Sequence, residues 1–339
     1  MSIPGPLAGR LRLPVIAAPM FLGSGPDLVV EACRAGLVGT FPALNQRTSE
    51  GYEAWLDEIS SRLSAHPSAA PFGVNLVVHT SNPRLAADLE LTVRHRVPLV
   101  ITSLGAAQEV VAAVHAYGGI VFHDVVNLRH ARKAAAAGVD GIVAVCAGAG
   151  GHGGTLSPFA LVAEIRSFYS GTIILSGAIS RGEDIVAARA LGADLAYIGT
   201  RFLATRESLV DAAQKQMMIE AGAADILYTP AITGVNANFM RQSLLRHGLD
   251  PDKPPQPGRL DMHEAKAWKT VWSAGQGVGT IRDIPTVAAL CERLAAEYAA
   301  TLERLGNDPF PAVPGASPLA AKPATSPPRK RSAAASGRR

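Results

Sequence analysis

The chain has 339 residues, of which 48% are hydrophobic, and its formal net charge is +4 at pH 7. This length and composition are those of a globular protein with one large domain or two ordinary ones. The positive charge does not indicate a nucleic-acid partner, because six basic residues and no acid lie within residues 322–339, and the remainder of the chain is net negative.

No segment of the sequence has the pattern of a membrane span or a signal peptide. The first twenty residues contain Arg10 and Arg12 but no continuous apolar run, and every later apolar run is interrupted by Gly, Pro or charge. The three cysteines, Cys33, Cys146 and Cys291, are widely spaced and form no CxxC pair, which favours reduced thiols. We therefore expect a soluble, unprocessed, cytoplasmic protein with no membrane partner.

Short runs rich in β-branched residues alternate with amphipathic segments between residue 14 and about residue 205. The runs are Val15–Ala18, Leu37–Phe41, Phe72–Val77, Leu99–Thr102, Ile120–Phe122, Ile142–Val145, Ile173–Leu175 and Leu195–Ile198. Eight strands with helical crossovers predict an α/β fold, the (β/α)8 TIM barrel. A doubly wound open sheet shows the same alternation, but its GxGxxG fingerprint is missing after the first strand.

The alternation stops after Arg206. We interpret residues 208–275 as an inserted, mostly helical lid over the barrel mouth, and residues 1–207 with 276–308 as the barrel itself. A final helix at about Ile284–Leu305 has apolar residues at helical spacing and is expected to pack on the barrel. Residues 309–339 contain Pro, Ala, Ser, Lys and Arg without hydrophobic periodicity, which predicts a disordered basic tail.

The sixth strand runs into a glycine-rich loop that surrounds one histidine. Glycines at 148, 150, 151, 153 and 154 flank His152, the one reactive side chain between Cys146 and Thr155. Glycine lets backbone lie flat against a ligand, so this loop is a candidate active-site floor with His152 as its working group. A flexible turn with a solvated histidine is the alternative.

Other strand ends carry groups suited to a phosphate and to a flavin. Ser176-Gly177-Ala178 follows the seventh strand and Gly199-Thr200 the eighth, the two places where TIM barrels commonly bind phosphate. The Asn75 amide suits a flavin's pyrimidine edge, and backbone at Ala18–Met20 can cover an isoalloxazine face. His123 and Asp124 are adjacent on a strand and face opposite ways, so we predict no shared metal site there.

These motifs together resemble the nitronate monooxygenase family, formerly called 2-nitropropane dioxygenases. The resemblance rests on Ala17-Ala18-Pro19-Met20, Phe72-Gly73-Val74-Asn75, Ala149-Gly150-Gly151-His152, Ser176-Gly177-Ala178-Ile179 and Leu191-Gly192-Ala193-Asp194 leading to Gly199-Thr200-Arg201-Phe202. It covers about residues 13–300 and implies a TIM barrel that holds FMN non-covalently. The cofactor contacts expected are Ala18, Pro19, Met20, Asn75, His123, Gly148, Gly151, Ser176, Gly177, Ala178, Gly199 and Thr200. His152 matches the family's catalytic base, and His123 stands where relatives often carry Lys.

The resemblance implies oxidation of alkyl nitronates, or of neutral nitroalkanes, by O₂. The same superfamily includes enoyl-acyl-carrier-protein reductase II and NADH:quinone reductase, so NAD(P)H-dependent reduction of quinones or enoyl thioesters is the alternative. Two further hypotheses are a nucleophilic Cys146, which is more typical of a small core residue, and a barrel without enzymatic activity. A small-molecule substrate is expected, and homodimer formation is left open.

Overall fold

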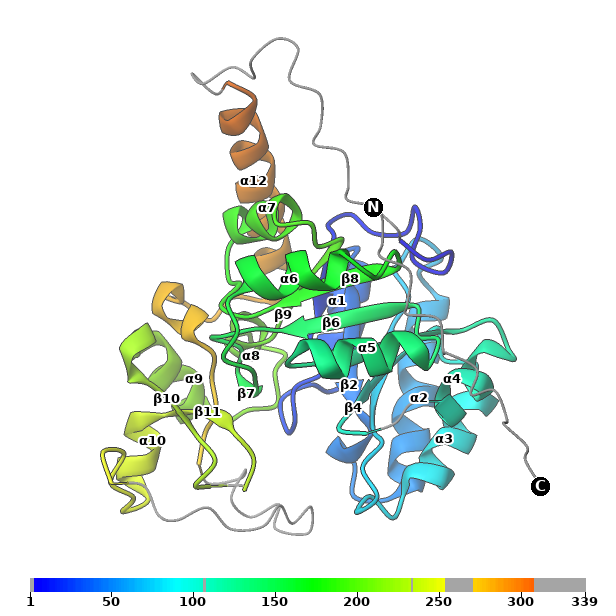
Figure 1. The fold of residues 1–339 in the computed structure, drawn as a ribbon, viewed down its shortest axis with the longest axis horizontal. Helices are drawn as coiled ribbons and strands as arrows, with labels where there is room; N and C mark the ends of the chain where they lie inside the picture. Colours follow the sequence, from blue (N-terminus) through cyan, green and yellow to red (C-terminus); the bar gives the residue numbers. More distant parts are fainter. Residues whose placement is uncertain (1–2, 106–107, 233, 254–270, 308–339) are drawn as a thin grey trace, which may run out of the picture.

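The computed structural model describes residues 3–105, 108–232, 234–253 and 271–307. Its centre is a closed parallel barrel in the order β1-β2-β3-β4-β5-β6-β8-β9 (Figure 1). The strands are β1 (Val15–Ala17), β2 (Val38–Pro42), β3 (Gly73–Val77), β4 (Leu99–Ser103), β5 (Ile120–Val125), β6 (Gly141–Val145), β8 (Thr172–Ser176) and β9 (Leu195–Ile198). Pairing of Val15 with Ala196 joins the first strand to the last and closes the barrel. The predicted TIM barrel is confirmed.

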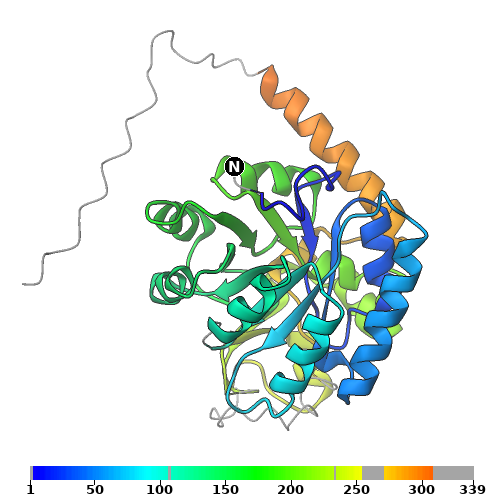
Figure 2. The same ribbon diagram turned by 90° about the vertical axis from the view of Figure 1, so that its right-hand side faces the viewer.

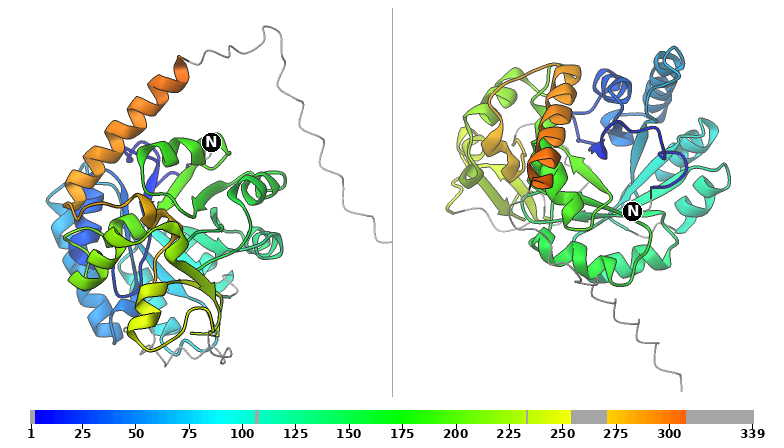
Figure 3. Two further views of the ribbon diagram at one scale, coloured as in Figure 1. Left: turned by 90° about the vertical axis from the view of Figure 1, so that its left-hand side faces the viewer. Right: turned by 90° about the horizontal axis from the view of Figure 1, so that it is seen from above.

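Helices surround the barrel on the outside, as Figures 2 and 3 show. The crossover helices are α1 (Pro26–Arg34), α2 (Ser49–Ser64), α3 (Leu85–Arg94), α4 (Gln108–His115), α5 (Leu128–Ala136), α6 (Pro158–Arg166) and α7 (Gly182–Ala190), and a one-turn helix, α8 (Thr200–Leu203), follows β9. Short 3₁₀ turns occur at η1 (Ala43–Asn45), η2 (Ala223–Asp225) and η3 (Gln276–Thr280). This alternation places every βα loop at one end of the barrel.

The strand residues divide into two buried layers because successive side chains point to opposite faces. Ile16, Ile101, Phe122 and Ile174 belong to the cluster that fills the barrel interior. Their sequence neighbours, Val100 among them, pack outward against the helices. Burial on both faces explains why the strands read as continuous apolar runs.

Within its described residues, the insertion after the eighth barrel strand contains strands as well as helices. It contains α9 (Ala212–Glu220) and α10 (Arg241–Arg246), but also β10 (Ile226–Thr229) and β11 (Ala237–Met240). These strands form an antiparallel sheet with β7 (Gly151–His152), in the order β10-β11-β7. The insertion is therefore joined by backbone hydrogen bonds to the glycine-rich loop.

The last helix, α12 (Val287–Gly306), lies along the barrel beside α7 and α1 (Figures 1 and 2). Val287, Leu290 and Leu294 are fully buried, as the helical spacing predicted, and the Gly182 amide donates to Glu297 Oε2 at 2.7 Å. The predicted tail, 309–339, lies outside the described residues. None of the described helices is long and apolar enough to cross a membrane.

Candidate active site

A cavity of about 1740 Å³ opens at the carboxyl ends of the barrel strands. It brings together every residue predicted for the site. These are Ala18, Pro19, Met20, Asn75, His123, Gly148, Gly151, His152, Ser176, Gly177, Ala178, Gly199 and Thr200. Residues from five strand ends and the glycine-rich loop thus share one space, although they lie far apart in the sequence.

The glycine-rich loop is held by the insertion and is not a free turn. Asn238 on β11 donates its amide to the Ala149 carbonyl at 2.6 Å. The Ser273 hydroxyl accepts from the Gly151 amide at 2.8 Å and donates to the Asn238 carbonyl at 2.6 Å. Tyr228 Oη donates to the Gly153 carbonyl at 2.9 Å. These bonds fix the backbone on both sides of His152.

We predict that Ser273→Ala destabilises this loop. The substitution removes one hydrogen bond from the Gly151 amide and one from the Asn238 carbonyl, and we expect the free energy of unfolding to fall by about 1–3 kcal/mol. Chemical denaturation measures the change. Ser64→Ala is the control, because Ser64 is exposed on α2 and bonds only within its own helix, to the Ser61 carbonyl. Equal stability of the two variants would contradict the role of Ser273.

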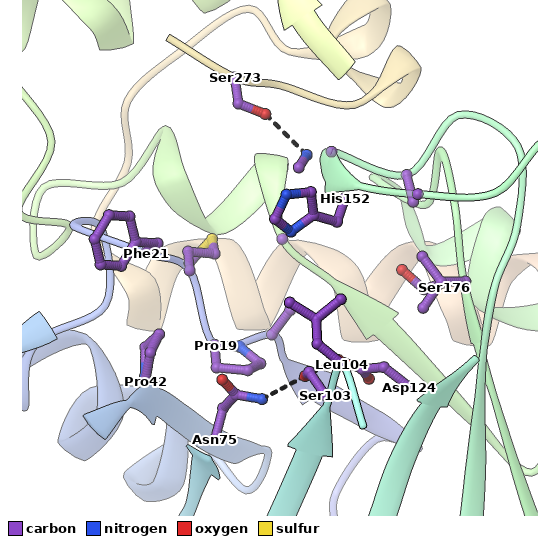
Figure 4. A pocket seen from close by; sticks show the side chains of 18 of the residues that line it. Pro19, Phe21, Pro42, Asn75, Ser103, Leu104, Asp124, His152, Ser176 and Ser273 are labelled. Atoms are coloured by element: carbon purple, nitrogen blue, oxygen red, sulfur yellow. Dashed lines mark hydrogen bonds between the residues drawn. The ribbon is translucent and has the colours of Figure 1, made fainter. Parts of the chain in front are cut away.

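His152 projects into the cavity from the insertion side (Figure 4). Asn75, Ser103 and Asp124 lie across the space from its ring. Burial lowers the pKa of His152, because a charged imidazolium is poorly solvated there. The neutral ring, which can accept a proton, is therefore the dominant form at neutral pH.

The loops at residues 176–178 and 199–200 consist of small residues and form a corner of the cavity where the backbone is accessible. Gly177 has φ +136°, and a Cβ there would lie 2.7 Å from the Ala147 carbonyl oxygen, so only glycine fits. Ala178 also has a positive φ, +55°, a strained conformation that often marks a functional site. A Cβ at Gly199 would have no heavy atom closer than 3.8 Å, which leaves room for a ligand.

The Asn75 amide is oriented by two acceptors on its neighbouring strand. Nδ2 donates to the Ile101 carbonyl at 3.1 Å and to Ser103 Oγ at 2.7 Å. Both N–H donors are thus used, and the amide presents its oxygen to the cavity (Figure 4). The site therefore offers a hydrogen-bond acceptor at this point.

His123 lines the cavity, and its contact with a flavin stays a prediction. It lies on the outward face of β5, where Nδ1 is hydrogen bonded to Thr102 Oγ1 at 2.7 Å. Burial, with the nearby charge of His130, lowers the pKa of His123 to about 4. The side chain that alternation turns inward is Asp124, and its Oδ2 accepts from Ser103 Oγ at 2.6 Å. Asp124 and His123 thus both line the cavity, from opposite faces of the strand.

The sequence reasoning missed the segment that returns from the insertion. Trp272, Ser273, Ala274, Gly275 and Gly277 line the cavity. The Gly275 amide donates to Thr200 Oγ1 at 2.8 Å, and the Gln276 amide donates to the Gly148 carbonyl at 2.9 Å. The alternating glycines of Gly275-Gln276-Gly277-Val278-Gly279 were the available signal.

Two other chemistries lack structural support. Cys146 is fully buried, and burial raises the pKa of its thiol to about 12, so it is not a thiolate nucleophile at neutral pH. Within the described part of the chain, no group of three or more His, Cys, Asp or Glu side chains could hold a metal ion.

The model of one protein family matches residues 8–297, and that family is described as nitronate monooxygenase. The chain belongs to the nitronate monooxygenase family. Members of this family are flavoenzymes, and this protein is a flavin-dependent oxidoreductase. The Paraburkholderia phytofirmans nitronate monooxygenase is 27% identical, with 88% of this chain and 96% of that protein covered.

Other proteins similar to this chain carry different names and match different shares of it. The 5-hydroxy-7a-methyl-1-oxo-octahydro-1H-indene-4-carboxyl-CoA dehydrogenase of Mycobacterium tuberculosis is 28% identical. That match covers 68% of this chain and 64% of the relative, slightly less than two thirds of its length. Among solved structures, a nitroalkane oxidase from Streptomyces ansochromogenes is 26% identical with a TM-score of 0.75, covering 89% of this chain and all of that one.

The cavity fits the flavin that the nitronate monooxygenase family implies. Its volume exceeds the roughly 300–1,000 Å³ of ordinary ligand pockets. The corner at Gly177 and Gly199 offers backbone and space to a phosphate, and Asn75 offers an acceptor to a ring N–H. The donor set and the free space are therefore compatible with a flavin mononucleotide.

Proposed function

We propose that this protein binds FMN at the barrel mouth and oxidises alkyl nitronates with molecular oxygen. His152 takes the α-proton of a neutral nitroalkane, or positions a nitronate that is already anionic. The observation that supports this most is the position of His152, on a loop held by Asn238 and Ser273 and facing Asn75 across the cavity.

In this proposal the chain holds the cofactor mainly through backbone and small residues. Residues 176–178 and 199–200 bind the phosphate, and the Asn75 oxygen accepts from the pyrimidine edge. Backbone at Ala18–Met20, Gly148 and Gly151 lines the ring. Bound FMN supplies a two-electron acceptor that oxygen can reoxidise.

The role of His152 depends on its protonation state. The neutral ring accepts the carbon-bound proton at an imidazole nitrogen, and a pKa near the working pH suits this transfer. Because burial disfavours the charged ring, the base form persists to lower pH than in a solvated histidine.

This proposal predicts the pH profile of turnover on a neutral nitroalkane. The pKa of His152 is lowered, so kcat/KM should be constant above about pH 6.5, the ordinary histidine value, and fall only below it. Turnover of a preformed nitronate should not show this acid limb. Steady-state rates from about pH 5 to pH 8 measure both profiles. An acid limb centred above the ordinary histidine pKa would contradict the assignment.

Two measurements test the proposal as a whole. Mass spectrometry of the released cofactor should find FMN, and an oxygen electrode should record uptake that depends on an added nitronate such as propionate 3-nitronate. A protein that purifies colourless and takes up no FMN would exclude this function.

The size of the cavity and two basic side chains in its lining favour a second candidate. Arg47 and Lys133 are basic side chains among the residues that line this space, which is larger than a flavin alone requires. Such basic side chains suit a phosphate-bearing second substrate, such as NAD(P)H or an acyl-coenzyme A thioester. The Mycobacterium tuberculosis relative carries the name of a CoA-ester dehydrogenase. This candidate keeps the flavin and changes the electron donor.

A further inference from the structure

Three polar side chains form a chain of hydrogen bonds across three neighbouring strands at the barrel mouth. Asn75 on β3 donates to Ser103 Oγ on β4 at 2.7 Å. Ser103 Oγ in turn donates to Asp124 Oδ2 on β5 at 2.6 Å. All three line the cavity (Figure 4). Two hydrogen bonds thus connect Asp124 to the side-chain amide of Asn75, whose oxygen faces the cavity.

The carboxyl group of Asp124 is only half satisfied. Its Oδ1 is buried and has no hydrogen-bond partner among the described residues. The hydroxyl of Tyr197, on β9, is also buried without a described partner. Burial raises the pKa of Asp124 to about 6, although the bond from Ser103 opposes the rise. An acid in this environment changes charge near neutral pH.

No described cation compensates the Asp124 charge. The causes of its pKa shift are burial and the hydrogen bond from Ser103, without a contribution from any Lys, Arg or His. Tyr197 is the titratable group from β9 that senses this charge, and its own pKa is raised, so it stays neutral. His123, next in sequence, faces outward to Thr102 and is neutral above about pH 4. The ionised carboxylate therefore projects an unbalanced negative charge into the mouth.

We propose that Asp124 is a positioning residue of the flavin site whose negative charge lowers the midpoint potential of the bound flavin. Its charge acts through space, from beside the amide that Ser103 and Asn75 orient, and its protonation removes the effect. This inference rests on the proposed placement of the pyrimidine edge at Asn75.

The physical reason is repulsion between like charges. Two-electron reduction adds electron density to the flavin, and a nearby carboxylate disfavours that state in a poorly solvated site. A neutral carboxylic acid does not. Because flavin reduction and Asp124 protonation are thermodynamically linked, each favours the other. Reduction of the flavin therefore raises the pKa of Asp124 and favours uptake of a proton. The potential should therefore rise as the pH falls through the pKa of Asp124.

The test is the midpoint potential of the holoenzyme, measured against reference dyes at about pH 5 and about pH 7.5. Asp124→Asn keeps the shape of the side chain and removes its charge. Glu303→Gln is the control, because Glu303 is exposed on α12 and its loss changes the net charge equally. At the higher pH, we expect Asp124→Asn to shift the equilibrium between oxidised and reduced flavin at least tenfold toward the reduced form. For a two-electron couple this is a rise of about 30 mV in the midpoint potential. At the lower pH, the difference in midpoint potential between Asp124→Asn and wild type should be less than a third of this value.

A second variant keeps the inference testable if Asp124→Asn fails to retain flavin. Ser103→Ala removes the bond that lowers the pKa of Asp124, so the acid stays protonated to higher pH and the rise in potential begins at a higher pH than in wild type. Equal potentials for Asp124→Asn and wild type at both pH values, or an unchanged profile in Ser103→Ala, would overturn the inference. Those results leave FMN binding intact, whereas a wild-type protein without flavin would overturn the proposed function as well.

Discussion

Replacing His152 with alanine is expected to lower turnover on a neutral nitroalkane by ~10²–10⁴-fold, the usual contribution of a positioned general base. Turnover on a preformed nitronate should change far less, because that substrate has already lost the α-proton. Flavin content should stay near wild type, since backbone and Asn75 hold the cofactor in our proposal. Steady-state kinetics on both substrates, with the flavin absorbance of each preparation, measure the effect.

His95→Ala is a suitable control for this experiment. His95 is the C-cap of α3, faces Glu53 and Asp57 on the outside of the barrel, and does not line the cavity. Its loss should leave both activities unchanged. Equal losses on the two substrates in His152→Ala, with flavin retained, would mean that the ring binds the nitronate as an imidazolium. The assignment of a base would then be wrong.

The second large effect is expected for Gly199→Asp, at the corner of the cavity where we propose that the FMN phosphate binds. The Cβ position at Gly199 is open, with Ala18 and Met20 atoms no closer than 3.8 Å, and φ is −103°, which any residue adopts. A carboxylate there would meet the phosphate, and like-charge contacts cost several kcal/mol. We expect the dissociation constant for FMN to rise by about 100-fold or more. Titration of the apoprotein with FMN measures it.

Gly199→Ala is the matched control, because it adds the Cβ without the charge and should retain FMN. Gly177 is a poorer site for this test, since its φ of +136° and the nearby Ala147 carbonyl would strain any other residue. Thermal denaturation of Gly199→Asp should match that of wild-type apoprotein. Tight FMN binding by Gly199→Asp would contradict the phosphate assignment.

The barrel could be predicted from the sequence because its signals are local. Each strand is a short apolar run, each crossover is amphipathic, and the predicted and observed strands differ at their ends by at most three residues. The largest difference lies in β5, which the structure extends to Val125. That extension matters, since alternation along the longer strand turns Asp124 inward and His123 outward.

The small sheet of the insertion could not be predicted in the same way. β10 and β11 are short, and their partner β7 is two residues of a glycine-rich loop. Such a strand has no periodicity of its own, and it forms because the insertion pairs with it. Likewise, the bond from Gly151 to Ser273 joins residues 122 positions apart. Local patterns therefore predicted which residues line the site but not what holds them there.

The most direct test of the account is anaerobic mixing of the purified yellow holoenzyme with a nitronate. We expect ethyl nitronate or propionate 3-nitronate to bleach the flavin absorbance, and admission of oxygen to restore it. NADH and NADPH, mixed in the same way, should leave the flavin oxidised. Rapid bleaching by NADH or NADPH, with no response to either nitronate, would contradict nitronate oxidation and favour the reductase.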